Sequence, residues 1–460
     1  MPKRSISVVL ILLSCAVSIS MGILLDRSSP SGTANFRAVY YGARCLLNHS
    51  DPYNPADFLR VYSKESGEFP VIPSKKQFFL RATMVCVNLP TTLFLVVPLA
   101  LLPWSLSHVL WLILVACCMI AAALLAHDLA REYAPGPALL LICLMMVNSE
   151  VLFATGNTAG IAVGLCVVAV WCFVRQRLEW LGILSMALSL AIKPHDSGLV
   201  WLFLLLAGGV LRKRSLQVLA VVALITIPAV LWFSSAAPDW SRELRANLAS
   251  TSAHGDISDP GPASISRKGS ADVLIDLQTV ASVFDDNPRV YNPLVYAVCG
   301  LLLLGWGFQL LRTPASTINT WYALAAVAPL AMLFSYHRPY DARLLLLAIP
   351  ACSLIWASGG IASRIAVIPN FAAVLFTSDI PLAIMTLLTA HVDILSLGGL
   401  QKILLLPLVR PAPLALFAAA LMNLWIYLKW AGKDSTSFVA IAPAEDVKGL
   451  PSASNHLIAP

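Results

Sequence analysis

The sequence predicts an all-α polytopic membrane protein, and three observations carry that prediction. Of its 460 residues, 58% are hydrophobic and only 12% are charged, whereas a soluble domain carries about 25% charge. Apolar runs of spanning length recur along the chain. The net charge of +7 suits the basic cytosolic loops that orient such proteins. Because backbone polar groups cannot stay unpaired in hydrocarbon, the apolar runs must form helices.

The first run, residues 5–25, follows Lys3 and Arg4 and is long enough to span a bilayer. Its length argues against a cleaved signal peptide. A polar segment follows at 26–83 and a second at 235–290. We expect roughly 11–13 transmembrane helices, with the later ones near 84–102, 107–126, 138–154, 159–174, 179–192, 197–211, 216–234, 292–311, 320–335, 343–358, 365–397 (two short helices) and 403–430.

These runs predict one integral membrane domain, residues 1–432, with 26–83 and 235–290 as long extracytoplasmic loops and 433–460 as a polar, disordered tail. The basic loop "LRKRS" at 211–215 is expected in the cytosol. The number of membrane crossings can be counted from this cytosolic loop or from a cytosolic N-terminus. The two counts disagree by one crossing, and the disagreement falls between residues 84 and 174. We therefore expect a re-entrant or split segment there, and the short run 138–154 is the first choice.

Four polar islands interrupt the apolar pattern. In the first, Asp26 to Phe58, the stretch "NFRAVYYGARCLL" predicts an amphipathic helix in the interface plane. Its expected polar face carries Arg37, Tyr41 and Arg44. Two guanidinium groups seven residues apart point the same way and suit a lipid phosphate. Arginines that snorkel to the headgroups are the alternative.

The other islands lie between later spans, where ionisable groups are functional candidates. "ATGNTAG" places the Asn157 amide at a break that suits a sugar hydroxyl or is simply a tight loop. The third and fourth islands supply further candidate binding residues: Lys193, His195 and Asp196 in "LAIKPHDSG", and His337, Arg338, Tyr340, Asp341 and Arg343 in "YHRPYDARL". The alternative for the third island is a charged loop at the interface, and the alternative for the fourth is a belt of interfacial residues with a tyrosine anchor.

Several classes are excluded. No P-loop, GxSxG, HExxH or Rossmann glycine motif occurs, so neither ATP-driven transport nor a dinucleotide cofactor is expected. The ten cysteines include no CxxC pair and no Cys/His set with metal spacing, so no metal site and no other cofactor is predicted. No loop combines a basic stripe with aromatic residues, so nucleic acid is not a partner. No feature indicates an oligomeric state.

The ordered set "NFRAVYYGARCLLNHSDPY", "NLPTTLFLVVPLALLPW", "GNTAGIAVGL", "GILSMALSLAIKP" and "YHRPYDARLLLLAIP" resembles glycosyltransferase family 87, the polyprenol-phosphate-mannose-dependent mannosyltransferases of GT-C fold. The resemblance covers most of residues 26–350. It implies a GT-C-like bundle in the bacterial inner membrane, with the active site on the extracytoplasmic face. It also implies a polyprenyl-phosphate sugar donor, a glycolipid or glycan acceptor and membrane lipids as partners.

In that family, an aspartate in the first outer loop looks like the catalytic base, and Asn35 stands at its place here. An amide cannot accept a proton at neutral pH. We therefore assign the base to Asp26 first and Asp51 second, with the remaining island residues binding substrate. Two other functions stay open: a carrier or flippase for lipid-linked sugars, and a catalytically altered, non-enzymatic relative. The transferase reading predicts that the islands meet in one outer pocket.

Overall fold

The computed structural model describes residues 4–28, 32–66, 77–265, 274–314, 316–394 and 396–431, and every regular element within them is helical. Seven helices are long and apolar enough to cross a membrane, and one bent pair adds an eighth candidate. Five shorter apolar helices of 10–17 residues accompany them. The predicted all-α polytopic class is confirmed. The predicted tail at 433–460 lies outside the described residues.

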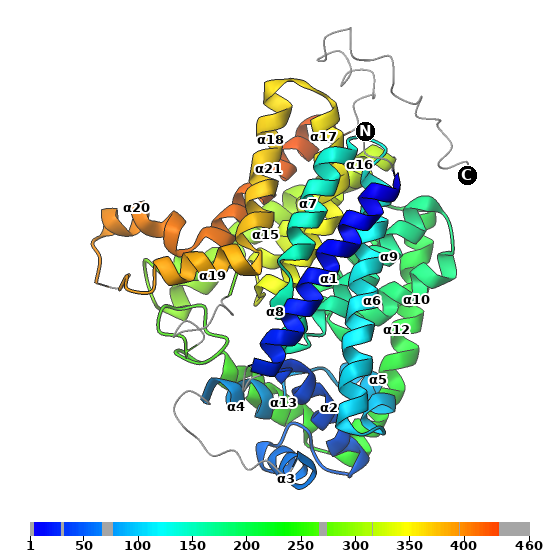
Figure 1. The fold of residues 1–460 in the computed structure, drawn as a ribbon, viewed down its shortest axis with the longest axis vertical. Coiled ribbons are helices and arrows are strands. Elements are labelled where there is room, and N and C mark those ends of the chain that lie inside the picture. The colour runs from blue at the N-terminus through cyan, green and yellow to red at the C-terminus, as the bar shows by residue number, and fades with distance from the viewer. Residues whose placement is uncertain are drawn as a thin grey trace.

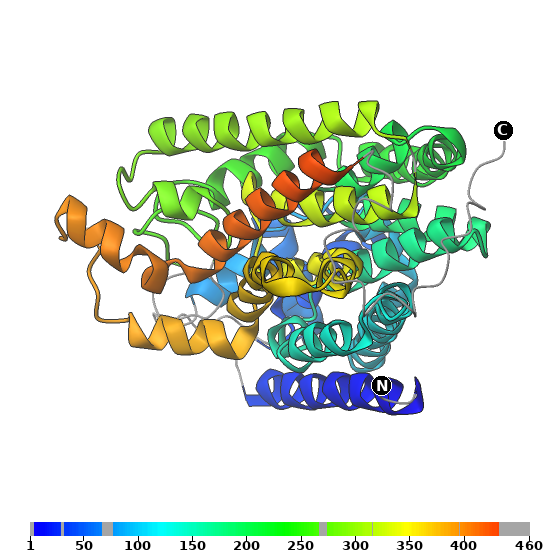
Figure 2. The same cartoon turned by 90° about the horizontal axis from the view of Figure 1, so that it is seen from above.

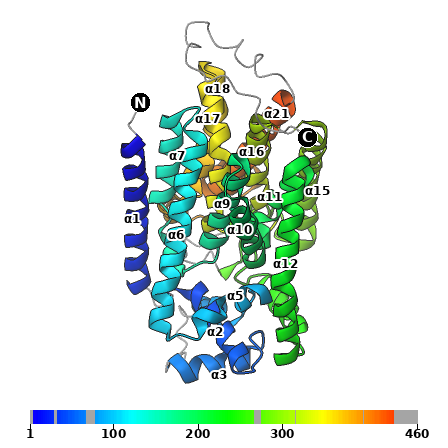
Figure 3. The same ribbon diagram turned by 90° about the vertical axis from the view of Figure 1, so that its right-hand side faces the viewer.

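The N-terminal half alternates long spans with short helices at one end of the bundle (Figure 1). Its elements are α1 (Arg4–Ser28), α2 (Ala34–Leu47), α3 (Pro55–Ser66), α4 (Gln77–Met84), α5 (Pro90–Ala100), α6 (Trp104–Ala130), α7 (Pro135–Val147), α8 (Glu150–Thr155), α9 (Ala159–Arg175), α10 (Glu179–Ile192) and α11 (Pro194–Leu206). Figure 3 shows α2, α3 and α5 gathered at one end of the bundle, with α2 and α5 between the lower parts of α6 and α12.

The C-terminal half supplies the centre of the bundle and its far edge. Its elements are α12 (Gly209–Ala236), α13 (Trp240–Thr251), α14 (Gln278–Ala281), α15 (Pro288–Arg312), α16 (Thr317–Leu333), the 3-10 helix η3 (Pro339–Ala348), α17 (Ile349–Ala357), α18 (Gly360–Phe376), α19 (Asp379–Leu388), α20 (Gly399–Val409) and α21 (Pro411–Trp430). Seen from above, α1 and α15 lie along opposite edges with α17 between them (Figure 2).

Burial separates central from lipid-facing helices. The span made by η3 and α17 is 83% buried, whereas α12 is only 17% buried. The outer helices expose leucines, among them Leu224 and Leu301. Because hydrocarbon solvates such side chains as well as a protein core does, these surfaces are suited to lipid. The central helices are shielded and can therefore carry polar groups.

Close helix packing depends on glycine at the crossing of α6 and α9. A Cβ atom added to Gly160 would lie 2.7 Å from Val115 Cγ1, and one added to Gly164 would lie 2.8 Å from Cys118 Cβ. Without a hydrophobic driving force between helices in lipid, small residues at such crossings allow the van der Waals contact that holds them together. This crossing fixes the position of α9, which begins within the second polar island.

Two segments bear on the re-entrant or split segment that we expect between 84 and 174. The run 138–154 is split, because α7 ends at Val147 and α8 begins at Glu150. Residues 135–155 form a 21-residue candidate span, whereas α5 has 11 residues and is about 16 Å long, too short to cross. The hydroxyl of Tyr53 donates to the carbonyl of Asn88 before α5 at 2.7 Å, and that of Tyr40 donates to Leu102 after it at 2.8 Å. Both ends of α5 therefore bind the first loop.

Two boundaries differ from the prediction. The basic stretch at 211–215 is not a loop, because α12 begins at Gly209 and runs through it. The predicted single run 403–430 breaks between α20 and α21 at Pro411, where proline begins a new helix. The predicted split at 365–397 is present: α18 and α19 meet at a bend of 77°.

The segments at one end of the bundle are joined by polar contacts. Arg81 Nη2 of α4 lies 2.6 Å from Asp256 Oδ2 of the second long segment. Asn247 Nδ2 of α13 donates to the carbonyls of Tyr53 and Cys86 at 2.8 and 3.0 Å. The backbone NH of Ile275 donates to the carbonyl of His337 at 3.0 Å. The first loop, the second loop and the fourth island therefore lie at the same end.

Candidate active site

A buried ion cluster joins the third and fourth islands. Lys193 Nζ forms an ion pair with Asp341 Oδ1 and lies 3.4 Å from Asp196 Oδ2. Asp196 and Asp341 are each 1% exposed. Burying charge without a partner is costly, so each ion in this cluster depends on the others. The third island therefore supplies one cation and one anion, and the fourth supplies a second anion.

Local sequence explains why Lys193 points into this cluster. Pro194 at the first position of α11 ends the hydrogen-bond ladder of α10, and Lys193 occupies the break. The hydroxyls of Thr91 and Thr92, at the start of α5, donate to the freed carbonyls of Ala191 and Ile192. The short α5 thus holds the break in place. Asp341 is fixed by the backbone NH of Arg338, which donates to Oδ2 at 2.8 Å.

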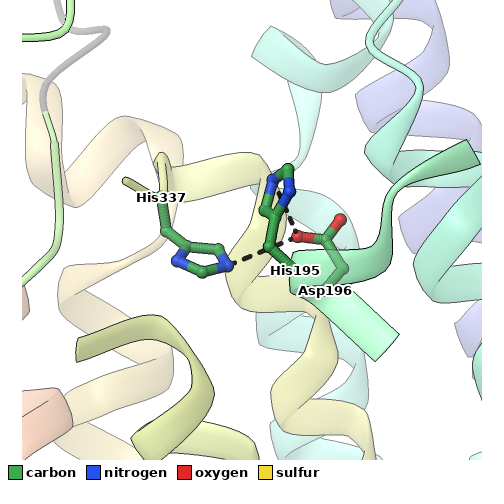
Figure 4. A group of neighbouring side chains, drawn as sticks. All are labelled: His195, Asp196 and His337. Carbon is green, nitrogen blue, oxygen red and sulfur yellow. Dashed lines mark ion pairs between the residues drawn. The ribbon is translucent and has the colours of Figure 1, made fainter. Parts of the chain in front are cut away.

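His337 completes the cluster (Figure 4). Its Nδ1 atom lies 2.9 Å from the carbonyl oxygen of Ser335, and its Nε2 atom lies 3.5 Å from Asp196 Oδ1. Burial lowers the pKa of His337, but Asp196 and Asp341 raise it by more, so its pKa lies above the ordinary value. His195 approaches Asp196 Oδ1 from the other side at 3.7 Å.

Metal-ligating atoms of three residues therefore come together. The ring nitrogens of His195 and His337 and a carboxylate oxygen of Asp196 all lie within 4.8 Å of one another. Our sequence reasoning predicted no metal ligands because it relied on local spacing. His337 comes 141 positions after Asp196 by residue number, a separation that no local motif captures.

Arg338 and Tyr340 lie beside the cluster. Arg338 Nε donates to the Tyr336 hydroxyl at 2.5 Å, and its Nη2 donates to the carbonyl of Ile257 at 2.9 Å. Lys193 Nζ lies 5.2 Å from the centre of the Tyr340 ring, a cation–π distance. The structure therefore brings together six of the predicted residues: Lys193, His195, Asp196, His337, Tyr340 and Asp341.

Arg343, by contrast, turns toward a different set of partners. Its Nη2 donates to the carbonyl of Asn148 at 2.7 Å and lies 3.5 Å from Asp379 Oδ1. These contacts join η3 to the breaks after α7 and α18. The predicted substrate-binding role of Arg343 stays a prediction, and these contacts hold helices together.

The first island forms the predicted helix, α2, but its faces differ from the prediction. Tyr41, expected on the polar face, is 2% exposed and lies between the rings of Tyr62 and Trp104, with ring centres 4.7 and 5.9 Å away. Arg44 Nε pairs with Glu65 Oε2 at 2.8 Å, and its Nη1 donates to the carbonyl of Ala100. Helices α3, α4 and α5 cover this helix on several sides, so hydropathy alone could not assign its exposed face.

Asp26 lies against the start of α2. The hydroxyl of Thr33 donates to its Oδ1 at 3.0 Å, and His108 Nε2 lies 3.4 Å from its Oδ2. Arg37 reaches the same place, because its Nε donates to the carbonyl of Gly32 at 3.3 Å and its guanidinium lies 4.9 Å from the centre of Trp104. The sequence analysis did not predict His108 as a site residue. The feature that could have indicated it is its position, a histidine one turn after the start of the apolar helix α6.

Asp51 and Asn157 make local turn contacts. Asp51 Oδ1 accepts a hydrogen bond from the backbone NH of Tyr53 at 2.8 Å, the geometry of an Asx turn. Burial raises the pKa of Asp51 and this hydrogen bond opposes the shift. Asn157 Oδ1 accepts from the backbone NH of Ala159 at 2.8 Å, just before α9. These hydrogen bonds of both side chains organise chain turns.

Together, the bundle and its buried ionisable cluster define a multi-pass membrane protein with a polar centre at one end of the helices. The family model of glycosyltransferase family 87 matches residues 88–335, which is more than half of the chain. The protein belongs to glycosyltransferase family 87, and this membership indicates glycosyltransferase activity. No curated protein and no solved structure matches the chain.

Proposed function

We propose that this protein transfers a hexose, with mannose the first choice, from a polyprenyl-phosphate donor to a glycolipid or glycan acceptor at the extracytoplasmic face of a bacterial inner membrane. The observation that carries the proposal is the buried cluster of Lys193, Asp196, His337 and Asp341. Ionisable groups buried at a membrane-embedded end are costly. A polar ligand that enters from the lipid gives a reason to retain them.

The reaction needs a base, and Asp26 is our choice. The acceptor hydroxyl oxygen bonds to the anomeric carbon, the bond from that carbon to the phosphate oxygen breaks, and polyprenyl phosphate leaves. The hydroxyl proton passes to the carboxylate. Asp26 belongs to the last turn of α1 and packs against the start of α2, beside Thr33 and near the position of Asn35. It can therefore supply there the carboxylate that Asn35 lacks.

The leaving phosphate needs positive charge aimed at it. Arg37 donates to the carbonyl of Gly32, lies over the ring of Trp104 and is near Asp26, the proposed base. Because the phosphate leaves from the carbon that the acceptor attacks, we assign it first to Arg37, and to Lys193 and Arg338 as the next choices. Losing one well-aimed donor typically reduces the rate by about 10²–10³.

The direct test is transfer in membranes. Membranes that contain the protein are incubated with polyprenyl-phosphate hexoses labelled in the sugar, and labelled glycolipid and glycan products are separated from the donor. The proposal predicts a labelled product that is absent from membranes without the protein. A carrier would move the donor across the bilayer and leave its sugar–phosphate bond intact, so an unchanged donor with every hexose would overturn the proposal.

A further inference from the structure

We propose that His195, Asp196 and His337 form a binding site for one divalent transition-metal cation of the Zn²⁺ class. His195 and Asp196 occupy the first turn of α11, and His337 comes from the segment before η3. The two ring nitrogens lie 3.7 and 3.5 Å from the same carboxylate oxygen. Ligands about 2.1 Å from a tetrahedral Zn²⁺ are about 3.4 Å apart, so these separations fit with little movement.

The protonation of His337 supplies an independent observation. A carbonyl oxygen only accepts hydrogen bonds, so the Nδ1 atom that lies 2.9 Å from the carbonyl of Ser335 carries a hydrogen. In the neutral ring, Nε2 then holds a lone pair. Metal-binding histidines almost always donate their other ring NH in this way, often to a backbone carbonyl. His337 is therefore oriented as a ligand would be.

The atoms that face the site have no hydrogen-bond partner among the described residues. Both carboxylate oxygens of Asp196 and the Nε2 atom of His337 are buried without one, the two side chains being 1% and 0% exposed, and Lys193 Nζ lies 3.4 Å from Asp196 Oδ2 as an ion-pair partner. A lone pair and a carboxylate that face each other repel. A positive charge is needed between them, and either a metal cation or a second ring proton supplies it. Buried polar atoms left without a partner otherwise cost free energy.

The surrounding charges favour a cation. Two carboxylates, Asp196 and Asp341, face one ammonium, Lys193. With neutral histidines, these three groups carry one net negative charge. Asp196 lies in the first turn of α11, where the helix dipole favours its ionised form. The carboxylate is thus held ready as a ligand.

The chemistry of the site selects the metal and leaves room for another ligand. Two imidazoles and one carboxylate suit Zn²⁺ better than Mg²⁺ or Ca²⁺, which prefer oxygen ligands. Three protein ligands leave a fourth tetrahedral position open. The His195 side chain is 38% exposed, so the site is accessible on that side. An oxyanion such as a phosphate would fit the open position, and this last step rests on the proposed function.

The experiment measures bound metal and does not depend on transfer. The full-length protein is purified in detergent, stripped with a chelator, loaded with ZnCl₂ and desalted, and its zinc content is measured by mass spectrometry. Binding of Co²⁺ is followed by its visible absorption, which reports nitrogen and oxygen ligation. We expect about one equivalent of Zn²⁺ per chain, and little retention of Mg²⁺ in the same procedure.

Two variants decide the location. His337→Ala removes the buried ligand, and His195→Ala removes an exposed ligand whose loss leaves the fold intact. Each should weaken Zn²⁺ binding by roughly 10–100-fold or more and change the Co²⁺ spectrum. His391→Ala, which removes an exposed histidine elsewhere, is the matched control. Equal zinc retention by all four proteins, or no zinc bound by the wild type, would overturn the proposal and leave the glycosyltransferase assignment unaffected.

Discussion

Lys193 and Asp341 are 148 positions apart in the chain and form a buried ion pair. The pair links the break between α10 and α11 to the start of η3. It therefore holds together two segments that are far apart in the sequence. Hydropathy shows each of them only as a separate interruption of the apolar pattern. Its partners Asp196 and His337 come from the same two segments, so this contact organises the candidate site.

Breaking this pair should destabilise the protein. In Lys193→Met, the Asp341 carboxylate loses its cation in a buried site, and removing one partner of such a pair costs about 3–5 kcal/mol. Asp341→Leu should lose a similar amount, and the double variant should recover part of it, because Asp196 still loses its contact with Lys193. Thermal unfolding of the detergent-purified protein measures all three. Arg242→Ala, at an exposed ion pair, is the control with little expected change; single variants as stable as that control would contradict the prediction.

Variants of the two candidate bases, Asp26 and Asp51, should differ clearly in their rate of sugar transfer. Asp26→Asn removes the carboxylate beside His108 and Thr33, and we expect transfer to fall by roughly 10²–10⁴-fold with expression unchanged. Asp51→Asn keeps an acceptor for the Tyr53 NH and should retain most activity. Initial rates with a labelled donor compare the two. If the Asp51 variant is the inactive one, the base assignment moves to Asp51.

The position of Asp26 should also depend on Gly32. A Cβ atom at residue 32 would lie 2.3 Å from both the carbonyl oxygen and Oδ1 of Asp26, so Gly32→Ala must displace this carboxylate. Since misplacing a catalytic group by about 1 Å can cost 10²-fold, the rate should fall steeply. Gly136→Ala, where the added atom meets nothing within 4 Å, is the control. Equal rates for the two variants would remove Asp26 from the reaction.

The arrangement of α5 gives a topological prediction. Cysteines introduced at Val87 and Leu101, both exposed, should be labelled by an impermeant maleimide from the same side of the membrane. A cysteine at Arg177, in the exposed turn after α9, should be labelled only from the other side. A Cys117→Ser background removes an exposed native thiol. Labelling of Val87 and Leu101 positions from opposite sides would mean that α5 crosses.

Hydropathy predicted the helical class and most spans, because burial in lipid demands long apolar helices whatever their neighbours. It could not tell that α5 is held at both ends by the first loop, since that depends on the hydrogen bonds of Tyr53 and Tyr40. It also placed the basic stretch at 211–215 in a loop. These basic residues lie in the first turns of α12, where their long side chains can reach the interface.

The site was predictable in its residue types and not in its pairings. Depth in the membrane singled out Lys193, Asp196 and His337, and the structure brings them together. Arg44 was also predicted to bind substrate, but it pairs with Glu65. Glu65 belongs to another helix, so the pattern of residues on the helix of Arg44 does not reveal this pair. The environments of Tyr41 and His108 were misjudged or missed for the same reason, because residues distant in the chain decide them. Tyr41 packs against Tyr62 of α3 and Trp104 of α6, and His108 lies beside Asp26 of α1.

The most direct measurement of the central claim is sugar transfer by the purified protein in liposomes that contain labelled polyprenyl-phosphate mannose and an envelope lipid extract. The account predicts that the wild type releases polyprenyl phosphate and forms a mannosylated product, whereas a folded Lys193→Met/Asp341→Leu protein forms little. An intact donor after incubation with the wild type, tested with mannose and with the other hexoses, would contradict the account. So would equal rates for the wild type and the double variant.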